Sequence, residues 1–220
     1  MKINQIESFI LNMEHRLSGS LPGQDAHVKM EPITRKKYLL HKMHDTEPKQ
    51  SAVLILIFHQ EDDLHIYLMK RNEYDGVHSG QISFPGGSFE KSDNNLFYTA
   101  LRETEEEIGI KIKDIKVLGN LTQLYIPPSN FNVFPVVGFL NSNPSLNIDN
   151  NEVDEIFSVS FSELLSDQNI GTGMIVTRDG NEIEVPCYWF KGHKVWGATS
   201  MILSEFIEAV NQTLYDSFIQ

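Results

Sequence analysis

Three glutamates on one predicted helix carry the clearest chemistry in this sequence. Glu103, Glu106 and Glu107 are spaced i, i+3 and i+4 within residues 96–108, so their side chains are neighbours on one helix face. Carboxylates this close repel one another, and a cluster of hard oxygen ligands suits Mg²⁺ or Mn²⁺. Taken alone, the run is more often a solvated acidic face, because charge runs usually face water.

A glycine-rich turn ahead of the helix favours a metal site over a solvated acidic face. The segment Phe84-Pro85-Gly86-Gly87 precedes it, and its glycines allow a phosphate to approach the backbone closely. Within the helix we expect nothing to compensate the three acids, the nearest cations being Arg102 and Lys111. We therefore expect a site for a metal ion and a phosphate between the turn and the acidic face.

The helix is predicted from its periodicity and its ends. Its apolar face, which can pack on a sheet, consists of Phe97, Leu101, Thr104 and Ile108. Gly109 is a C-terminal stop. The N-cap candidates are Ser92, Asp93 and Asn94.

The elements around this helix follow from hydrophobic patterning. Residues 3–17 predict an amphipathic helix, 24–50 a polar and poorly periodic arm, 161–166 a short helix, and 203–214 an amphipathic C-terminal helix. Strands are predicted at 51–58, 65–70, 115–126, 132–140 and 155–160, and a hairpin at 173–190 with Asp179-Gly180 in its turn. Many strands with few helices predict an α/β fold, a mixed β-sheet sandwiched between helices.

Composition narrows the class of partner. The chain has 18 Lys and Arg against 30 Asp and Glu, a net charge of −12, which repels nucleic acid and anionic membranes. Its one cysteine, Cys187, excludes an intramolecular disulfide and is expected to be a buried apolar residue. No segment has the ~18 apolar residues that a membrane span needs, so the cytoplasmic compartment is the expectation.

Residues 80–110 resemble the Nudix family signature. Its second half is matched at 102–110 by Arg-Glu-Thr-Glu-Glu-Glu-Ile-Gly-Ile, with Thr104 at a hydrophobic position. In the first half Asp93 stands where the family has Glu, and one additional residue separates it from Arg102. This longer spacing is typical of one branch, the coenzyme A diphosphatases.

That branch also has an upstream pattern, which this chain resembles. It is present here as Arg71, then His78, then Gly80-Gln81-Ile82-Ser83-Phe84-Pro85-Gly86-Gly87. The branch usually has a second Arg two residues before the His, where this chain has Gly76. The resemblance covers about residues 50–205, with residues 1–48 expected as an N-terminal helix and arm packing on the domain and 49–220 as the Nudix hydrolase domain with its C-terminal helix.

The resemblance implies roles for individual residues. Glu103, Glu106 and Glu107 bind Mg²⁺, with Mn²⁺ as a substitute, and Glu103 stands where some relatives hold the catalytic base. A further catalytic carboxylate from a later loop is Glu152 or Glu155. The substrate-binding candidates are Arg71, His78, Gly86 and Gly87. Arg102 is expected to orient a helix carboxylate, and Trp196 and Tyr188 to line the pocket or belong to the core.

The implied activity is Mg²⁺-dependent hydrolysis of the diphosphate bond of coenzyme A or a derivative. The products are 4′-phosphopantetheine and adenosine 3′,5′-bisphosphate, and Arg71 is the first candidate for the substrate's 3′-phosphate, with Lys70 or His78 sharing the task. Two alternatives stay open: hydrolysis of another nucleoside diphosphate compound such as ADP-ribose or a dinucleotide, and a Nudix sensor that binds without cleaving. The expected partner is a small diphosphate, without nucleic acid or membrane, and a homodimer is left open.

Overall fold

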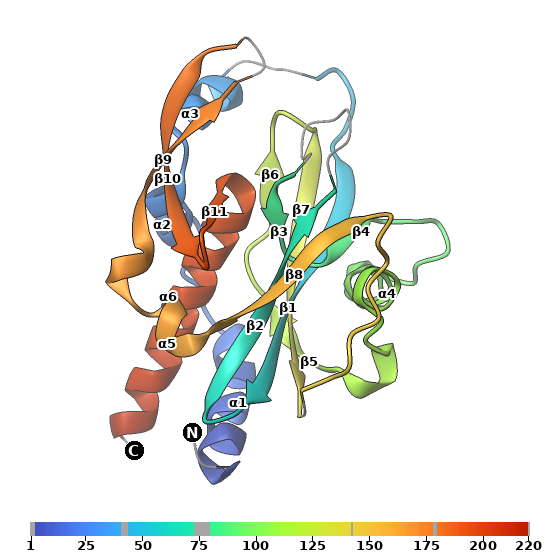
Figure 1. The fold of residues 1–220 in the computed structure, drawn as a ribbon, viewed down its shortest axis with the longest axis vertical. Coiled ribbons are helices and arrows are strands. Elements are labelled where there is room, and N and C mark those ends of the chain that lie inside the picture. The colour runs from blue at the N-terminus through green and yellow to red at the C-terminus, as the bar shows by residue number, and fades with distance from the viewer. Residues whose placement is uncertain (1–2, 41–43, 73–79, 142, 178–179, 220) are drawn as a thin grey trace.

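The computed structural model of the protein describes residues 3–40, 44–72, 80–141, 143–177 and 180–219 (Figure 1). His78, Gly76 and Asp179, which the sequence singles out, lie outside the described residues.

A mixed sheet forms the centre of the fold. Among the described residues it has eight strands in the order β3-β2-β1-β7-β5, with β4 paired to β1, β6 to β7 and β8 to β2. Strands β1 and β7 are parallel, and the other pairs are antiparallel. The bounds are β1 Lys49–Gln60, β2 Asp63–Arg71, β3 Ile82–Ser83, β4 Gly86–Ser88, β5 Lys116–Asn120, β6 Leu124–Ile126, β7 Phe131–Leu140 and β8 Val153–Ser160.

Helices cover both faces of this sheet. Helices α1 (Ile3–Leu17) and α6 (Gly197–Ile219) lie on one side, and α4 (Leu96–Ile108) lies on the other (Figure 1). The alternation of strand β1 builds two cores, with Ile55 and Ile57 in the cluster of α1 and α6 and with Leu54 and Leu56 in the cluster of α4. The predicted mixed sheet between helices is thus confirmed.

A second, three-stranded antiparallel sheet lies beside α6. It consists of β9 (Ile170–Val176), β10 (Glu182–Phe190) and β11 (His193–Trp196), in the order β11-β10-β9. The predicted hairpin corresponds to β9 and β10. The short helix α5 (Phe161–Leu164) precedes this sheet and begins with a capping box. In this box the Ser160 hydroxyl accepts the Glu163 backbone N–H, and the Glu163 carboxylate accepts the Ser160 backbone N–H.

The polar arm contains helices that its sequence pattern did not predict. They are α2 (Gln24–His27), the 3₁₀ turn η1 (Val28–Met30) and α3 (Ile33–Leu40). Outside the arm, the described residues contain two further 3₁₀ turns, η2 (Ile112–Asp114) and η3 (Asp167–Asn169). The fully buried Glu205 of α6 holds the start of the arm, because its carboxylate bonds to the Gly23 N–H at 3.1 Å and the His27 ring at 2.8 Å. It also accepts the Thr122 hydroxyl at 2.6 Å, so one acid joins arm, sheet and helix.

Several predicted bounds are corrected. The single strand expected at 115–126 is two strands, β5 and β6, and the C-terminal helix begins at Gly197 rather than near residue 203. The helix at 96–108 is confirmed, with Gly109 at φ +79° as its C-cap. The N-cap prediction is wrong: the cap is Asn95, whose Oδ1 accepts the Tyr98 N–H at 2.9 Å.

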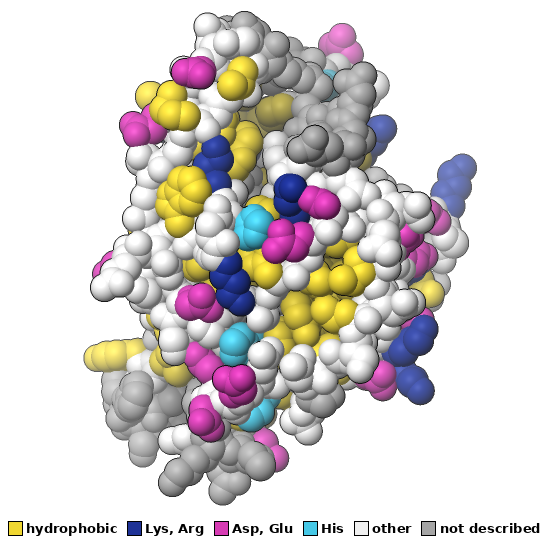
Figure 2. Space-filling model, viewed as in Figure 1, with side chains coloured by type: hydrophobic (Ala, Val, Ile, Leu, Met, Phe, Trp, Pro, Cys, Tyr) yellow, Lys and Arg dark blue, Asp and Glu magenta, His cyan; other side chains and the backbone are white. Residues whose placement is uncertain are grey.

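The charged surface, the single cysteine and the length of the helices can be compared with what the composition predicts. Figure 2 shows acidic and basic side chains interspersed over one face of the molecule. Cys187 is fully buried, as expected. Within the described part of the chain, no helix is both long enough and apolar enough to cross a membrane.

Candidate active site

The Gly86-Gly87 segment ahead of α4 belongs to the short strand β4, and the backbone at Gly86 requires glycine. Strand β4 pairs with β1, Gly86 opposite Val53 and Gly87 opposite Ala52. Gly86 has φ +149°, and a Cβ there would lie 2.6 Å from the Val53 Cα. A side chain at Gly86 is therefore excluded both by conformation and by space.

Glu107 is the most deeply placed of the three helix acids. Its side chain is 1% exposed; one oxygen accepts the Gly86 N–H at 2.8 Å, and the other lies 3.4 Å from Arg71 Nη1. Burial raises the pKa of Glu107 to about 8, against the opposing effects of Arg71 and the Gly86 N–H. The charges of Glu103 and Glu152 raise this pKa further.

Glu103 lies against the second glycine. A Cβ on Gly87 would be 2.5 Å from Glu103 Oε2, so a side chain there would displace this carboxylate. Burial raises the pKa of Glu103; Arg102 lowers it, and the charges of Glu106 and Glu152 raise it. Glu103 and Glu107 therefore both lie beside the Gly86-Gly87 turn.

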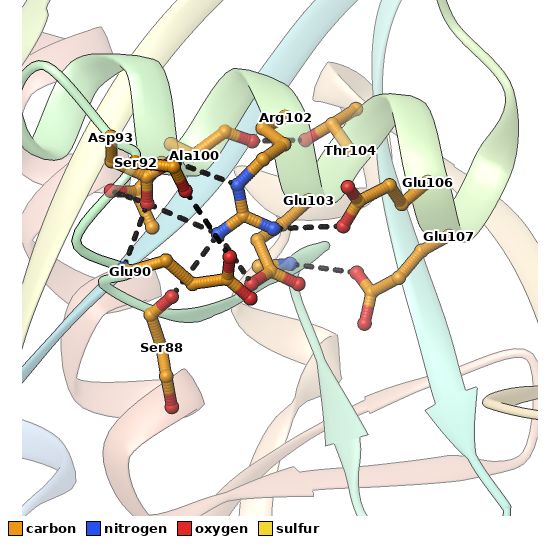
Figure 3. A network of polar contacts seen from close by, with 12 residues as sticks. Ser88, Glu90, Ser92, Asp93, Ala100, Arg102, Glu103, Thr104, Glu106 and Glu107 are labelled. Atoms are coloured by element: carbon orange, nitrogen blue, oxygen red, sulfur yellow. Dashed lines mark hydrogen bonds and ion pairs between the residues drawn. The ribbon is translucent and has the colours of Figure 1, made fainter.

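Arg102 organises the acids around it (Figure 3). Its Nη2 donates to Glu103 at 3.0 Å and its Nη1 to Glu106 at 2.8 Å. Its Nε donates at 2.8 Å to the fully buried Asp93, and this contact holds the pKa of Asp93 at about 2. The expectation that nothing in the helix compensates the acids is therefore wrong, whereas the expected orienting role of Arg102 agrees with its contacts.

Glu106 is the outer member of the set. Its side chain is 59% exposed and is bound to Arg102. In the described part of the chain, no group of three His, Cys, Asp or Glu side chains is arranged to hold a metal ion. The structure thus brings Glu103 and Glu107 together at the turn and leaves Glu106 at its rim.

Of the two later acids, Glu152 lies in the loop that contacts the end of α4. The loop before β8 is tied to the end of α4, because the Asp149 N–H donates to the Glu107 carbonyl at 2.9 Å. The Glu152 charge raises the pKa of both Glu103 and Glu107. Glu155 instead lies 3.3 Å from His193, and its charge is not among the causes that shift the pKa of Glu103 or Glu107.

Arg71 reaches the site through an irregularity in the sheet. The β2–β8 register shifts between Lys70 and Arg71, and such bulges re-aim side chains. Lys70 pairs with Asp154 at 2.6 Å, whereas Arg71 lies at Glu107. Arg71 is therefore beside the acids, and His78 lies outside the described residues.

A cavity of about 500 Å³ opens beside the turn and includes Gly86, Gly87 and Arg71 in its lining. Trp196 lines this cavity, whereas Tyr188 is 4% exposed and belongs to the core. Arg35 and Tyr38 of α3 also line it. Sequence reasoning missed both, because the arm has too little periodicity to place α3.

Curated relatives share most of this region. An uncharacterised Nudix hydrolase, NudL, of Photorhabdus laumondii is 36% identical over 145 residues, which is 66% of this chain and 76% of the relative. NudL of Yersinia pestis is 31% identical over 163 residues, 74% of this chain and 80% of the relative. The mitochondrial coenzyme A diphosphatase NUDT8 of Homo sapiens is 35% identical over 140 residues, 62% of this chain and 58% of the relative.

The NUDIX domain model matches residues 48–191. That range contains the acids of α4, the glycine turn and the loop of Glu152. Together with the relatives, this match shows that the chain belongs to the Nudix hydrolase family, whose members hydrolyse small-molecule diphosphates and generally use divalent metal ions.

Proposed function

We propose that this protein is a Mg²⁺-dependent hydrolase that cleaves the diphosphate bond of coenzyme A or a derivative. The products are 4′-phosphopantetheine and adenosine 3′,5′-bisphosphate. The observation that carries the proposal is the pair of acids, Glu103 and Glu107, which lie beside a turn whose two glycines also line a cavity.

The donor set suits a hard divalent cation. Glu103 and Glu107 supply carboxylate oxygens where burial and the charges of neighbouring carboxylates raise both pKa values, and a cation relieves the repulsion between the carboxylates. Mn²⁺ suits the same ligands. Glu106 joins as a third ligand if its side chain leaves Arg102, whose contacts with Asp93 and Ser88 then hold the guanidinium in place.

The cation and the neighbouring side chains have separate roles in the proposed reaction. When bound, the cation neutralises charge on the diphosphate oxygens and lowers the pKa of a coordinated water. Glu103 or Glu152 accepts the proton of the water that attacks phosphorus. In this proposal Arg71, which lies 3.4 Å from Glu107, binds a phosphate oxygen of the diphosphate, whereas the sequence alone made it a candidate for the 3′-phosphate.

Coenzyme A is favoured as substrate by two features. The run from Arg71 to Gly87 and the longer spacing between Asp93 and Arg102 both resemble the coenzyme A diphosphatase branch. One relative carries that activity in its name. A neutral residue, Gly76, at the position of the second Arg leaves ADP-ribose as the alternative substrate.

The test compares kcat/KM for coenzyme A, dephospho-coenzyme A and ADP-ribose in the presence of Mg²⁺. We expect coenzyme A to be the best substrate. Arg71→Ala should lower kcat/KM for all three compounds, because all contain the diphosphate. A clear preference for ADP-ribose would reassign the substrate, and a selective loss on coenzyme A in Arg71→Ala would return Arg71 to the 3′-phosphate.

A further inference from the structure

Helix α3 lines the cavity beside the glycine turn but has no buried face of its own. Thr34, Arg35 and Tyr38 belong to the cavity wall. None of the eight described residues of α3 is buried, and Ile33 and Leu40 are 78% and 83% exposed. Isolated helices this short are marginal in water, and most helices gain their stability by packing an apolar face. The position of α3 therefore depends on the contacts that tie the arm to the rest of the domain.

Before α3, a buried carboxylate of α6 holds the arm. The side chains of Glu205 and His27 are 0% and 1% exposed and lie 2.8 Å apart. The same carboxylate accepts the Gly23 N–H at 3.1 Å and the Thr122 hydroxyl at 2.6 Å. Burial opposes the ionisation of Glu205, but its contacts with His27 and Thr122 outweigh burial and hold its pKa below the usual value. Buried donors that lose their acceptor are costly, so these contacts of Glu205 form a latch between α6 and the arm.

At and after α3, two further contacts tie the arm to β6 and to the turn that follows it. Arg35 Nη1 donates to the Tyr125 carbonyl at 2.6 Å, and the His44 ring lies 2.8 Å from the Pro127 carbonyl. Pro127 also lines the cavity, whereas the described lining of the cavity does not include Glu205. The latch therefore acts on the cavity through the arm rather than by contact with a bound molecule.

We infer that Glu205 is a positioning residue, which holds α3 against the cavity and so sets the affinity for the diphosphate substrate without touching it. The arm then has a docked state, in which α3 completes the cavity wall, and an undocked state, in which the cavity lacks that wall. Substrate binds the docked state, so its apparent affinity falls in proportion to the fraction of docked molecules. At saturation every molecule is docked, and kcat is unchanged. The inference rests on the proposed function for the identity of the substrate, and it assigns a role to residues on both sides of 48–191, the range that the family model matches.

Steady-state kinetics with coenzyme A and Mg²⁺ test the inference in Glu205→Ala and His27→Ala. If loss of the latch leaves about one molecule in ten docked, KM should rise about tenfold while kcat stays within about twofold of wild type. His27→Ala removes the latch from the side of the arm, so the test stays decisive where Glu205→Ala does not fold.

Glu208→Ala is the matched control, one turn further along α6. Glu208 lies 2.5 Å from Lys29 and also joins the arm to α6, but these two side chains are 36% and 56% exposed. Exposed ion pairs contribute little to stability. Glu208→Ala should therefore keep the KM and the kcat of wild type.

Limited trypsin digestion measures docking of the arm without turnover. Trypsin cleaves after Arg35, Lys36 and Lys37 of α3, and cleavage within a helix requires local opening. In both latch variants these sites should be cut at least about tenfold faster than in wild type. Lys113 in η2 is exposed, and cleavage after it is the internal reference, which should not change. Equal acceleration at Lys113 in both variants would show loss of the whole fold and overturn the latch.

The two readouts must agree. Wild-type KM in the latch variants, or a lower kcat with KM unchanged, would overturn the inference, and so would a higher KM without faster cleavage in α3. A wild type that cleaves no diphosphate, with faster trypsin cleavage in the latch variants, would refute the hydrolase and support the latch. Cleavage of coenzyme A with the same KM by wild type and Glu205→Ala would refute the role of the latch alone.

Discussion

The buried carboxyl of Glu107 should make the stability of the metal-free protein fall as pH rises. Its pKa is about 8 in the folded protein against an ordinary 4.5, so the folded state holds the proton more tightly than the unfolded chain. The stability contributed by protonation is complete below about pH 4.5 and is lost as pH rises through about 8. Glu107→Gln removes this titration while keeping an acceptor for the Gly86 N–H.

The magnitude follows from the interval between the two pKa values. A shift from 4.5 to about 8 corresponds to about 5 kcal/mol over the whole titration, of which about 3 kcal/mol falls between pH 5 and pH 8. Asp93, with its pKa at about 2, contributes no change in this window, because its stabilisation is lost only as pH falls through that value.

The assay is urea denaturation in excess chelator at pH 5 and pH 8, followed by tryptophan fluorescence. Wild type should lose about 3 kcal/mol more of its unfolding free energy between these pH values than Glu107→Gln loses. The matched control is Glu105→Gln on the same helix, because contacts with the Ile112 N–H and Lys111 lower the pKa of Glu105. This control should keep the wild-type slope, and saturating Mg²⁺ should flatten it, because the cation binds the ionised acids. The same pH slope in Glu107→Gln and wild type would refute the reasoning.

Three further changes test the framework of the site. Asp93→Ala should cost about 3 kcal/mol in urea denaturation, because Arg102 loses its fully buried partner; a cost within about 0.5 kcal/mol, the range of a neutral surface change, would contradict the assigned network. Asn95→Ala should cost about 1 kcal/mol with kcat unchanged, because only the helix cap is lost, whereas the same change at exposed Asn94 should be silent. Glu152→Gln should lower kcat at least about 100-fold with Tm unchanged, and Glu155→Gln is its control; an equal effect of the two would remove Glu152 from the mechanism.

Features with a local cause were predictable from the sequence. Helix α4 has the expected bounds because its apolar periodicity and Gly109 act within a few residues. Strand β1 packs against helices on both faces of the sheet, because its consecutive apolar residues point alternately to one face and to the other. The proximity of Glu103 and Glu107 follows from their helical spacing, although their separate contacts with Gly87 and Gly86 depend on how β4 pairs with β1.

Features that depend on distant contacts were not predictable in this way. Asp93 has the residue type of a helix cap, and only the loop geometry shows that it is the buried partner of Arg102. The arm gives too weak a pattern to place α3, which is held by contacts of Arg35 with Tyr125 and Glu31. The division at residue 48 and the set of metal ligands stay predictions.

The central claim is most directly tested by mass spectrometry of coenzyme A incubated with Mg²⁺ and either wild type or Glu107→Gln. Wild type should yield 4′-phosphopantetheine and adenosine 3′,5′-bisphosphate in equal amounts, and excess chelator should stop their formation. Glu107→Gln, shown to be folded by its urea transition, should form little of either product. Intact coenzyme A with wild type, or equal turnover by the variant or in chelator, would contradict the account.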